Sequence, residues 1–244
     1  MEQQQQENRS EEQRPSLKSP VGSADEEIYV TGSKSIILLS GGLDSAVALY
    51  WAIEHGLGIE TLTFDYFRRN PKEIQAGLEL SRRANCPNTR LELNFLKELD
   101  DLKTAELKNP LLEGVESAYI PSRNMIFYGI ASSIAEIIDA KYIVGGHNKN
   151  DATTFPDSSE SFFEAFNKVA SMGRISGSRT GKVLLPFAKL DKSEVIRIGV
   201  ELSVPFELTW SCYENRNVPC SKCYSCLLRS EAFAMAGVKD PLTP

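Results

Sequence analysis

The 244-residue chain has no apolar run close to the roughly 20 residues that a membrane-spanning helix requires. Its N-terminus also lacks the apolar core of a signal peptide, so we expect a cytoplasmic protein. Positive charge is not in excess, because the formal net charge is −6 and the pI is about 5.2. The overall charge therefore disfavours a nucleic-acid partner. Internal repeats and collagen-like or prion-like tracts are absent as well, which leaves an ordinary globular composition.

Two regions of different composition divide the chain. Residues 1–34 are rich in Gln, Glu, Ser, Arg and Pro. We predict a disordered tail there, because such a segment buries too little apolar surface to offset its ordering entropy. Residues 35–205 are expected to form an α/β domain, and residues 206–244 a small helical segment that carries most of the cysteines.

Short apolar runs alternate with segments of helical periodicity after residue 34. Strands are predicted at 35–40, 59–64, 90–93, 142–144 and 183–185. Helices are predicted at 44–55, 72–85, 123–139, 158–172, 192–203 and 225–236. Residues 94–117 are predicted to be irregular with helical pieces at most, and 146–157 to be a loop. The alternation of strands and helices predicts a doubly wound parallel sheet.

The stretch SIILLSGGLDSAVALYW places a glycine pair between a buried strand and a helix. Glycine tolerates positive φ and leaves backbone N–H groups accessible, and a helix N-terminus attracts anions. Gly41 and Gly42, with hydroxyl donors from Ser40 and Ser45, therefore predict a phosphate or pyrophosphate site. Asp44 either caps the helix or holds a magnesium ion that bridges the phosphates. Neither the Walker motif nor the G-x-G-x-x-G fingerprint is present.

Four of the five cysteines lie close together near the C-terminus, in SCYENRNVPCSKCYSC. Disulfides are rare in cytosolic proteins, so a metal site is the preferred interpretation. Cys212, Cys220, Cys223 and Cys226 are predicted to hold a structural Zn²⁺, because four thiolates leave no position for an activated water. An iron–sulfur cluster is the competing metal site. Cys86 is expected to be an ordinary half-buried cysteine.

The motif S-G-G-x-D-S, between a hydrophobic strand and a helix, resembles the pyrophosphate loop of the N-type ATP pyrophosphatases. Over Ser35 to Pro241 the chain further resembles the 7-cyano-7-deazaguanine synthase family. Four landmarks carry this resemblance: SGGLDS at 40–45, YIPSRNMIF at 119–127, GHNKNDATTFPDS at 146–158, and SCYENRNVPCSKCYSCLLRSEAFAMAGVKDP at 211–241.

This resemblance implies a Rossmann-like domain with a small zinc-bearing C-terminal part, and a homodimer. It implies conversion of 7-carboxy-7-deazaguanine, ammonia and ATP into 7-cyano-7-deazaguanine, through adenylation of the carboxylate, formation of the amide and dehydration of the amide to the nitrile. The cofactors it implies are ATP, Mg²⁺ and Zn²⁺. The partners are small molecules, and a protein acceptor stays open.

The residues implied in these roles follow the matching motifs. Asp44, Lys192 and Arg123 are expected to be catalytic, with Lys192 stabilising the α-phosphate. Tyr66, Arg69, Asp151 and Asp157 are expected to bind the substrate. The nucleotide is expected at Leu39, Ser40, Gly41, Gly42, Leu43, Asp44, Ser45, Ala46, Val47, Ala48, Leu49, Arg123 and Asn124. The alternatives are a surface arginine for Arg123, a solvated lysine for Lys192, and loop caps for Asp151 and Asp157.

The chain departs from the family pattern at several positions. The segment FDYFRRN stands where the family reads close to F-D-Y-G-Q-R-H, TFPDS stands for G-Y-P-D-C, and IPSRN stands for V-P-G-R-N. The altered positions include Phe67, Arg68, Asn70, Thr154 and Ser158. They raise the alternative of a paralogue that adenylates a deazapurine acid and couples it to an amine on a protein or another acceptor. A zinc-bearing binding module without catalysis would be expected to have a damaged S-G-G-x-D-S motif, and the motif is intact.

Overall fold

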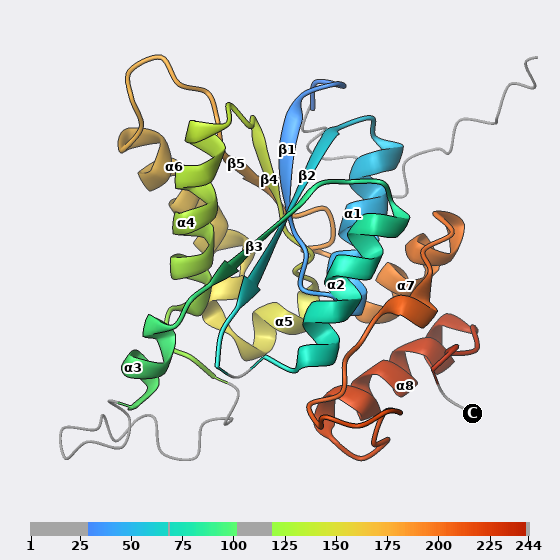
Figure 1. Ribbon diagram of the computed structural model, residues 1–244. Coiled ribbons are helices and arrows are strands. Elements are labelled where there is room, and N and C mark those ends of the chain that lie inside the picture. Colours follow the sequence, from blue (N-terminus) through green and yellow to red (C-terminus); the bar gives the residue numbers. More distant parts are fainter. Residues whose placement is uncertain (1–28, 68, 102–118, 243–244) are drawn as a thin grey trace, which may run out of the picture.

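The computed structural model describes residues 29–67, 69–101 and 119–242 (Figure 1). Five parallel strands form one sheet in the order β3-β2-β1-β4-β5. The strands are β1 (Lys34–Leu38), β2 (Gly58–Asp65), β3 (Asn88–Glu92), β4 (Tyr142–Val144) and β5 (Lys182–Leu184). All five predicted strands are present, and the doubly wound α/β prediction is confirmed. Most of the predicted tail, residues 1–28, lies outside the described residues.

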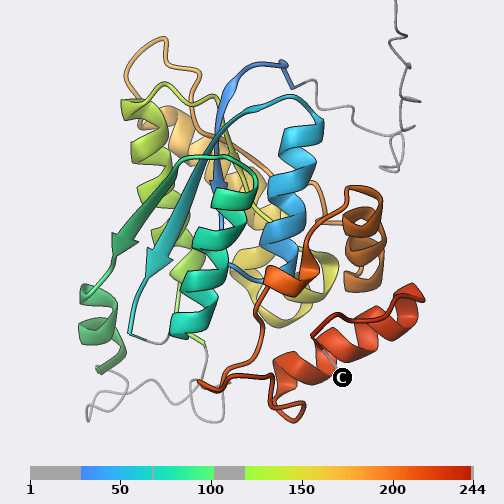
Figure 2. The same ribbon diagram turned by 45° about the vertical axis from the view of Figure 1, so that its right-hand side comes forward.

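Helices cover both faces of the sheet. Successive residues of a strand point to opposite faces, so each strand contributes side chains to both cores. Ile37 of β1 belongs to the core on the side of α1 (Leu43–Glu54), whereas Ile36 faces the core beneath α4 (Arg123–Ile137). Figures 1 and 2 show α1, α2 (Pro71–Arg83) and α7 (Lys192–Glu201) on one side of the sheet. On the other side lie α4 and α6 (Glu160–Met172).

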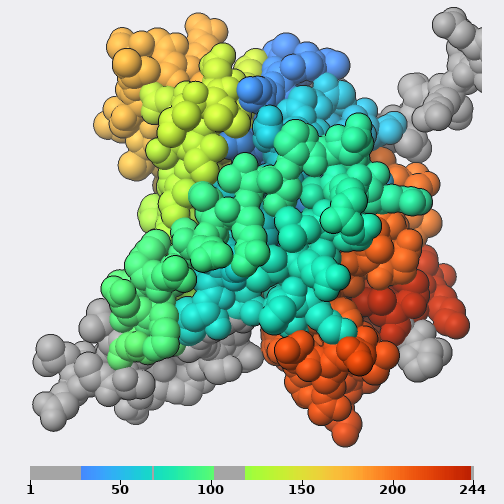
Figure 3. All heavy atoms as spheres, viewed as in Figure 1, coloured from blue at the N-terminus to red at the C-terminus, as the bar shows by residue number. Residues whose placement is uncertain are grey.

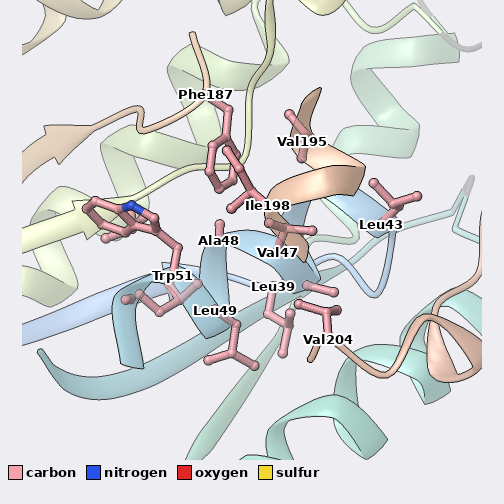
Figure 4. Packing of buried hydrophobic residues seen from close by; sticks show 14 of the residues in the cluster. Leu39, Leu43, Val47, Ala48, Leu49, Trp51, Phe187, Val195, Ile198 and Val204 are labelled. Carbon is pink, nitrogen blue, oxygen red and sulfur yellow. The ribbon is translucent and has the colours of Figure 1, made fainter. Parts of the chain in front are cut away.

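Helix α1 lies at the centre of the first core. Its residues Val47, Ala48 and Leu49 are fully buried. They pack among side chains of α7, such as Val195 and Ile198 (Figure 4). Burial of each large aliphatic side chain stabilises the fold by about 1.5–3 kcal/mol. This packing fixes the N-terminal end of α1, which directly follows the glycine loop.

The C-terminal segment shares this core. Phe206 of η4 (Phe206–Leu208) packs edge to face on Phe233 of α8 (Tyr224–Ala236), with ring centroids 5.3 Å apart. The buried Arg229 side chain donates to both carboxylate oxygens of Asp240 at 2.8 and 2.9 Å. In the space-filling view the orange and red C-terminal segment lies directly against the surface of α2 (Figure 3).

Three short helices lie where the sequence predicted a loop or irregular chain. Helix α5 (Lys149–Thr154) and η3 (Pro156–Ser158) occupy most of the predicted loop 146–157, so that prediction is wrong. The reason is a capping box, in which the Asn148 side chain accepts from the N–H of Asp151 and the Asp151 carboxylate accepts from the N–H of Asn148. Helix α3 (Phe95–Asp101) begins the predicted irregular stretch, and residues 102–118 lie outside the described residues.

Residues 29–34, which the sequence assigns to the tail, pack on the domain. The Tyr29 ring lies edge to face on Trp51, with centroids 5.2 Å apart, and makes a similar contact with His55. The N–H of Gly32 donates to the carbonyl of Gly56 at 2.7 Å. These contacts follow from the apolar Tyr29–Val30 pair, which interrupts the polar composition of the segment before it.

Ser122 precedes α4 in the left-handed backbone region, at φ 54°. This is one of the positions where the family pattern has glycine. A Cβ in this conformation costs roughly 1–2 kcal/mol, and the Ser122 side chain makes no capping hydrogen bond that offsets it.

We expect Ser122→Gly to raise the free energy of unfolding by about 0.5–1 kcal/mol, after allowance for the greater backbone entropy of glycine in the unfolded chain. Urea denaturation of the two proteins measures the difference. Ser122→Ala is the matched control, because it keeps the Cβ and should give no gain. Equal stabilities of the alanine and glycine variants would contradict the strain argument.

Candidate nucleotide-binding active site

A cavity of about 280 Å³ lies beyond the carboxyl ends of β1 and β4. From β1 the chain continues to β2 on one side of the sheet, while β4 pairs with β1 on the other. Loops that leave neighbouring strands in opposite directions open a crevice, and ligands of doubly wound sheets bind there. The lining residues are Leu38, Ser40, Gly42, Asp44, Ser45, Tyr66, Arg69, Glu73, Arg123, Asn124, Phe127, Tyr128, Gly146, His147, Asp151, Phe155 and Ser158.

The two glycines of the predicted phosphate loop serve different purposes. Gly41 has φ +87°, and a Cβ there would lie 2.0 Å from the backbone oxygen of Glu73. Glycine at this position therefore lets α2 pack directly on the loop. Gly42 is the N-cap of α1 with an extended backbone at φ −77°, so it does not use the positive φ that glycine permits. It lines the cavity, where its backbone is accessible.

The serine hydroxyls brace the loop from inside. The hydroxyls of Ser40 and Ser45 are 3.0 Å apart, the N–H of Gly42 donates to the Ser40 Oγ at 3.1 Å, and the Ser45 Oγ donates to the Gly42 carbonyl at 2.9 Å. The first-turn N–H groups of α1 have no partner within the helix and carry its positive partial charge toward the cavity. The arrangement is that of a preformed anion site at a helix N-terminus.

Asp44 stands in the first turn of α1, one residue inside the start of the helix, and does not cap it. Its carboxylate accepts from the Lys192 ammonium at 2.8 Å and from the Asn148 side-chain amide at 3.1 Å. Burial lowers the pKa of Lys192, but the Asp44 and Asp151 carboxylates outweigh this effect and raise it, so the ammonium stays charged. The structure thus places Lys192 against the phosphate loop, although 148 residues separate it from Asp44.

Asp151 lines the same cavity from α5. Burial and the neighbouring Asp44 charge raise its pKa to about 6, while Lys192 opposes the rise. Its carboxylate also accepts from the N–H of Asn148 at 3.1 Å. Asp151 therefore belongs both to a loop cap and to the cavity wall.

The opposite wall carries two guanidinium groups on either side of Tyr66. Arg123, the first residue of α4, donates to the Tyr66 hydroxyl at 3.3 Å, and the Arg69 guanidinium lies 5.8 Å from the centre of the Tyr66 ring. Arg69 also donates to the Ser40 carbonyl and forms an ion pair with Glu73 at 3.2 Å. Two positive groups beside the phosphate loop suit a ligand with more than one anionic group.

Asp157 is not among the residues that line the cavity. Its carboxylate accepts from the N–H of Asn124 at 3.0 Å, at the start of α4. The Asn124 side chain in turn donates to the Asp157 carbonyl and to the Ser158 hydroxyl at 3.0 and 2.9 Å. Asp157 thus has the capping role that the sequence analysis gave as the alternative. The Asn124 side-chain amide points toward η3.

The apolar members of the predicted nucleotide set are core residues. Leu39, Leu43, Ala46, Val47, Ala48 and Leu49 are each at most 1% exposed. Their side chains hold α1 in place, so any contact of these residues with a nucleotide is left to the backbone.

Several cavity residues were missed by the sequence reasoning. They are Glu73 of α2, the aromatic residues Phe127, Tyr128 and Phe155, and His147 with Gly146 at the end of β4. Gly146 allows a close approach, because a Cβ there would lie 2.6 Å from the backbone oxygen of Asp44. The stretch GHNKND, next to a strand end, was a signal for His147. Phe127 and Tyr128 carried none, since aromatic residues in a long apolar helix are indistinguishable from core.

The four clustered cysteines meet at one point. Their Sγ atoms all lie within 4.8 Å of one another, with Cys212 and Cys226 buried. A tetrahedral Zn²⁺ site with Zn–S bonds of about 2.3 Å has sulfur atoms about 3.8 Å apart, so the donor set fits such an ion. Beyond this cluster, no other group of three or more metal-binding side chains occurs among residues 29–67, 69–101 and 119–242.

The cysteine segment is tied to the phosphate loop. The N–H of Trp210 donates to the Gly41 carbonyl at 2.9 Å. Asn70 caps α2 through its side-chain oxygen and donates through its amide to the carbonyls of Cys212 and Glu214 at 3.1 and 3.0 Å. Asn70 therefore links α2 to the metal segment, and its departure from the family histidine affects this link.

The other departures lie mostly outside the cavity. Phe67 is 40% exposed and Thr154 is exposed at the end of α5, and neither is among the lining residues. Ser158 lines the cavity and is held by Asn124. Arg68 lies outside the described residues.

The fold and the loop define the class of protein. A doubly wound parallel sheet whose S-G-G-x-D-S turn opens a helix at the crevice is characteristic of the PP-loop ATP-dependent enzymes. Two solved structures share the fold. NMN synthetase from Francisella tularensis has a TM-score of 0.51 and 18% identity, and the match covers 86% of this chain and 79% of that one. The U34-tRNA thiolase NcsA from Methanococcus maripaludis has a TM-score of 0.50 and 16% identity, and the match covers 86% of this chain and 67% of that one.

Within this class the chain belongs to one family. The model of the queuosine biosynthesis protein QueC matches residues 34–237. The 7-cyano-7-deazaguanine synthase of Methanothermobacter thermautotrophicus is 36% identical over 220 residues, which cover 85% of this chain and 97% of that protein. The protein of the same name from Nostoc punctiforme is 36% identical over 222 residues, 86% of this chain and 98% of that one. The chain is therefore an enzyme of the QueC family of ATP-dependent ligases.

The described helices include none that is both long and apolar enough to cross a membrane.

The cysteine cluster leads to a prediction about bound metal. Cys223→Ser removes one of four thiolates, so we expect bound zinc to fall from one to well below one equivalent per chain, and the melting temperature to fall with it. Metal analysis by plasma mass spectrometry and thermal denaturation measure the two effects. Cys86→Ser, outside the cluster, is the control and should keep its metal. Iron in place of zinc, or metal unchanged in the Cys223 variant, would contradict the predicted site.

His147 leads to a prediction about pH. Burial, aided by the Arg123 charge, lowers the pKa of His147 to about 4, below the 6.5 of a free histidine. The unfolded chain therefore binds the proton more tightly, and the contribution of His147 to stability is present above pH 6.5 and is lost as the pH falls toward 4. His147 stacks on Phe163 at 5.3 Å, so His147→Phe keeps the packing.

We expect the loss of unfolding free energy between pH 7 and pH 4.5 to be smaller by about 2 kcal/mol in His147→Phe than in the parent protein. Urea denaturation at the two pH values gives this difference. The same pH dependence in both proteins would show that His147 titrates alike in the folded and unfolded states.

Proposed function

We propose that this chain catalyses the ATP-dependent conversion of 7-carboxy-7-deazaguanine and ammonia into 7-cyano-7-deazaguanine. One observation carries the proposal: the S-G-G-x-D-S loop and Arg123 line a single cavity with aromatic walls, and Lys192 contacts this loop at Asp44. The relatives named 7-cyano-7-deazaguanine synthase, which align with the chain over nearly their whole length, support this assignment.

The first step is activation of the carboxylate. A carboxylate is a poor electrophile until one of its oxygens becomes part of a good leaving group. The substrate carboxylate attacks the α-phosphorus of ATP, forming the acyl-adenylate and releasing pyrophosphate. The loop from Ser40 to Ser45 binds the departing pyrophosphate through the N–H groups in the first turn of α1, so that catalysis is by positioning and charge stabilisation.

Asp44 and Lys192 exchange partners when ATP binds. Lys192 turns from Asp44 to the α-phosphate, where charge accumulates, and the Asp44 carboxylate would then hold the Mg²⁺ that accompanies the nucleotide. A lysine and an aspartate paired at 2.8 Å are oriented in advance for this exchange. The pair also keeps two partly buried charges compensated before ATP arrives.

The deazaguanine ring binds in the part of the cavity lined by Phe127, Tyr128 and Phe155. Flat aromatic side chains suit a planar bicyclic ring. Asp151 offers an acceptor for the guanine-like N–H edge, and Arg69 with Arg123 offers donors for the carboxylate. Tyr66 holds Arg123 toward the cavity.

The second half of the reaction repeats the activation. Ammonia displaces AMP from the acyl-adenylate and gives the amide, and a second ATP activates the amide oxygen. Loss of this oxygen with AMP, together with both amide protons, leaves the nitrile. The same loop and Lys192 serve both activations, because the reacting oxygen occupies the same position each time.

The cysteine cluster acts in support of the loop. Cys212, Cys220, Cys223 and Cys226 would hold zinc, which supplies a structural crosslink and no reacting group when bound. Through Trp210 the metal segment maintains the Gly41 turn.

The placement of Phe67, Asn70 and Thr154 away from the cavity favours nitrile formation over coupling to an amine on a protein, although the altered Ser158 lines it. Asn70 is a structural link, and Phe67 and Thr154 are not among the lining residues. The homodimer implied by the family and the cytoplasmic location stay predictions.

The test is incubation of the purified chain with ATP, Mg²⁺ and 7-carboxy-7-deazaguanine. We expect pyrophosphate and, with ammonium present, 7-cyano-7-deazaguanine by mass spectrometry. Lys192→Ala should lower kcat at least about 100-fold, because it removes a charge that acts in the transition state. Lys189→Ala, on a side chain that is 70% exposed, is the matched control and should stay within twofold. Adenylation without nitrile would favour the paralogue that uses another acceptor.

A further inference from the structure

Glu73 is a cavity residue that has no part in the activation steps above. It stands in the first turn of α2, whose backbone packs on the phosphate loop at Gly41. Its side chain lines the cavity together with Tyr66, Arg69 and Arg123, on the wall where the substrate carboxylate is placed.

The three carboxylates that line the cavity differ in how firmly the protein holds them. Asp44 accepts from Lys192 and Asn148, and Asp151 accepts from the N–H of Asn148. Glu73 has an ion pair with Arg69, and its carboxylate accepts no hydrogen bond from any group in the described part of the chain. Glu73 is thus the carboxylate that is most available to a ligand.

Its ion pair is incomplete. The Arg69 side chain is only 7% exposed, and its Nε lies 3.2 Å from the Glu73 carboxylate. The angle is nevertheless too poor for a hydrogen bond, so this buried Nε has no hydrogen-bond partner among the described residues. Both groups keep unused capacity toward the cavity: a donor on Arg69 for an anion, and acceptors on Glu73 for a cation.

We propose that Glu73 binds the ammonium ion and, as general base, converts it into the ammonia that attacks the acyl-adenylate; this inference rests on the function proposed above. Ammonium is the predominant form of the nucleophile at neutral pH and cannot attack, since it has no lone pair. A carboxylate on the wall that orients the reacting carboxyl group is placed to remove its proton. Burial raises the pKa of Glu73, against the Arg69 and Arg123 charges, which makes it a better base.

The step balances as follows. One proton passes from ammonium to the Glu73 carboxylate, leaving ammonia with its lone pair. The nitrogen forms a bond to the acyl carbon, and the bond from that carbon to the AMP oxygen breaks, its electron pair leaving with AMP. The nitrogen then loses a second proton to solvent, which gives the neutral amide. Glu73 returns its proton to solvent before the next turnover.

The experiment compares ammonium with hydroxylamine, a nucleophile that is largely unprotonated at neutral pH. The full chain and Glu73→Gln are assayed with ATP and 7-carboxy-7-deazaguanine. We expect kcat/KM for ammonium to fall about 100-fold in the variant, and kcat/KM for hydroxylamine to change less than about threefold. Glu79→Gln, on the same helix and outside the cavity, is the matched control and should match the parent with both nucleophiles.

Exchange of labelled pyrophosphate into ATP, measured without any nitrogen nucleophile, separates the two proposals. If the parent shows no exchange that depends on the acid, the proposed function itself fails. If the parent exchanges but Glu73→Gln loses activity equally with both nucleophiles, or loses none with ammonium, Glu73 is not the base. A rise in KM for the acid in the variant, with the ammonium dependence unchanged, would likewise overturn the inference and make Glu73 a substrate contact.

Discussion

The close backbone packing around Gly41 is the constraint on which the rest of the structure depends. Because this residue lacks a Cβ, the first turn of α2 reaches the loop, and Glu73 and Arg69 come with it. The Gly41 carbonyl also accepts from Trp210, so the loop is held from the cysteine segment as well. A side chain at Gly41 would separate these segments and displace the catalytic wall together with the phosphate site.

The sheet order turns this local packing into a site. Since β1 lies between β2 and β4, the loop after β1 is flanked by side chains from both halves of the chain. Arg69 arrives after β2, His147 after β4 and Lys192 from α7, each held by its own contacts. These side chains are therefore held by rigid elements, as the proposed mechanism, which depends on positioning, would require.

The sequence predicted what local patterns determine. The S-G-G-x-D-S turn and the cysteine spacing each lie within one short segment, and the strands followed from apolar runs. What it missed depends on contacts between distant segments. Glu73 resembles any exposed acid at a helix start, and only the packing at Gly41 places it in the cavity. For Asp157 the motif predicted a substrate contact. In the structure its carboxylate instead accepts a hydrogen bond from the N–H of Asn124 at the start of α4.

The charged groups of the cavity form two classes, and the difference explains how one site can perform successive steps. Asp44 and Lys192 are paired with good geometry at 2.8 Å, so the proposed exchange of partners would require a ligand with strong charges of both signs, such as ATP with a metal ion. The Arg69–Glu73 pair at 3.2 Å lacks hydrogen-bond geometry, so a small cation can compete for the partly exposed Glu73 carboxylate at lower cost. In the proposed mechanism the well-formed pair responds to the nucleotide and the poorly formed pair to the nucleophile, which would separate activation from attack within one site.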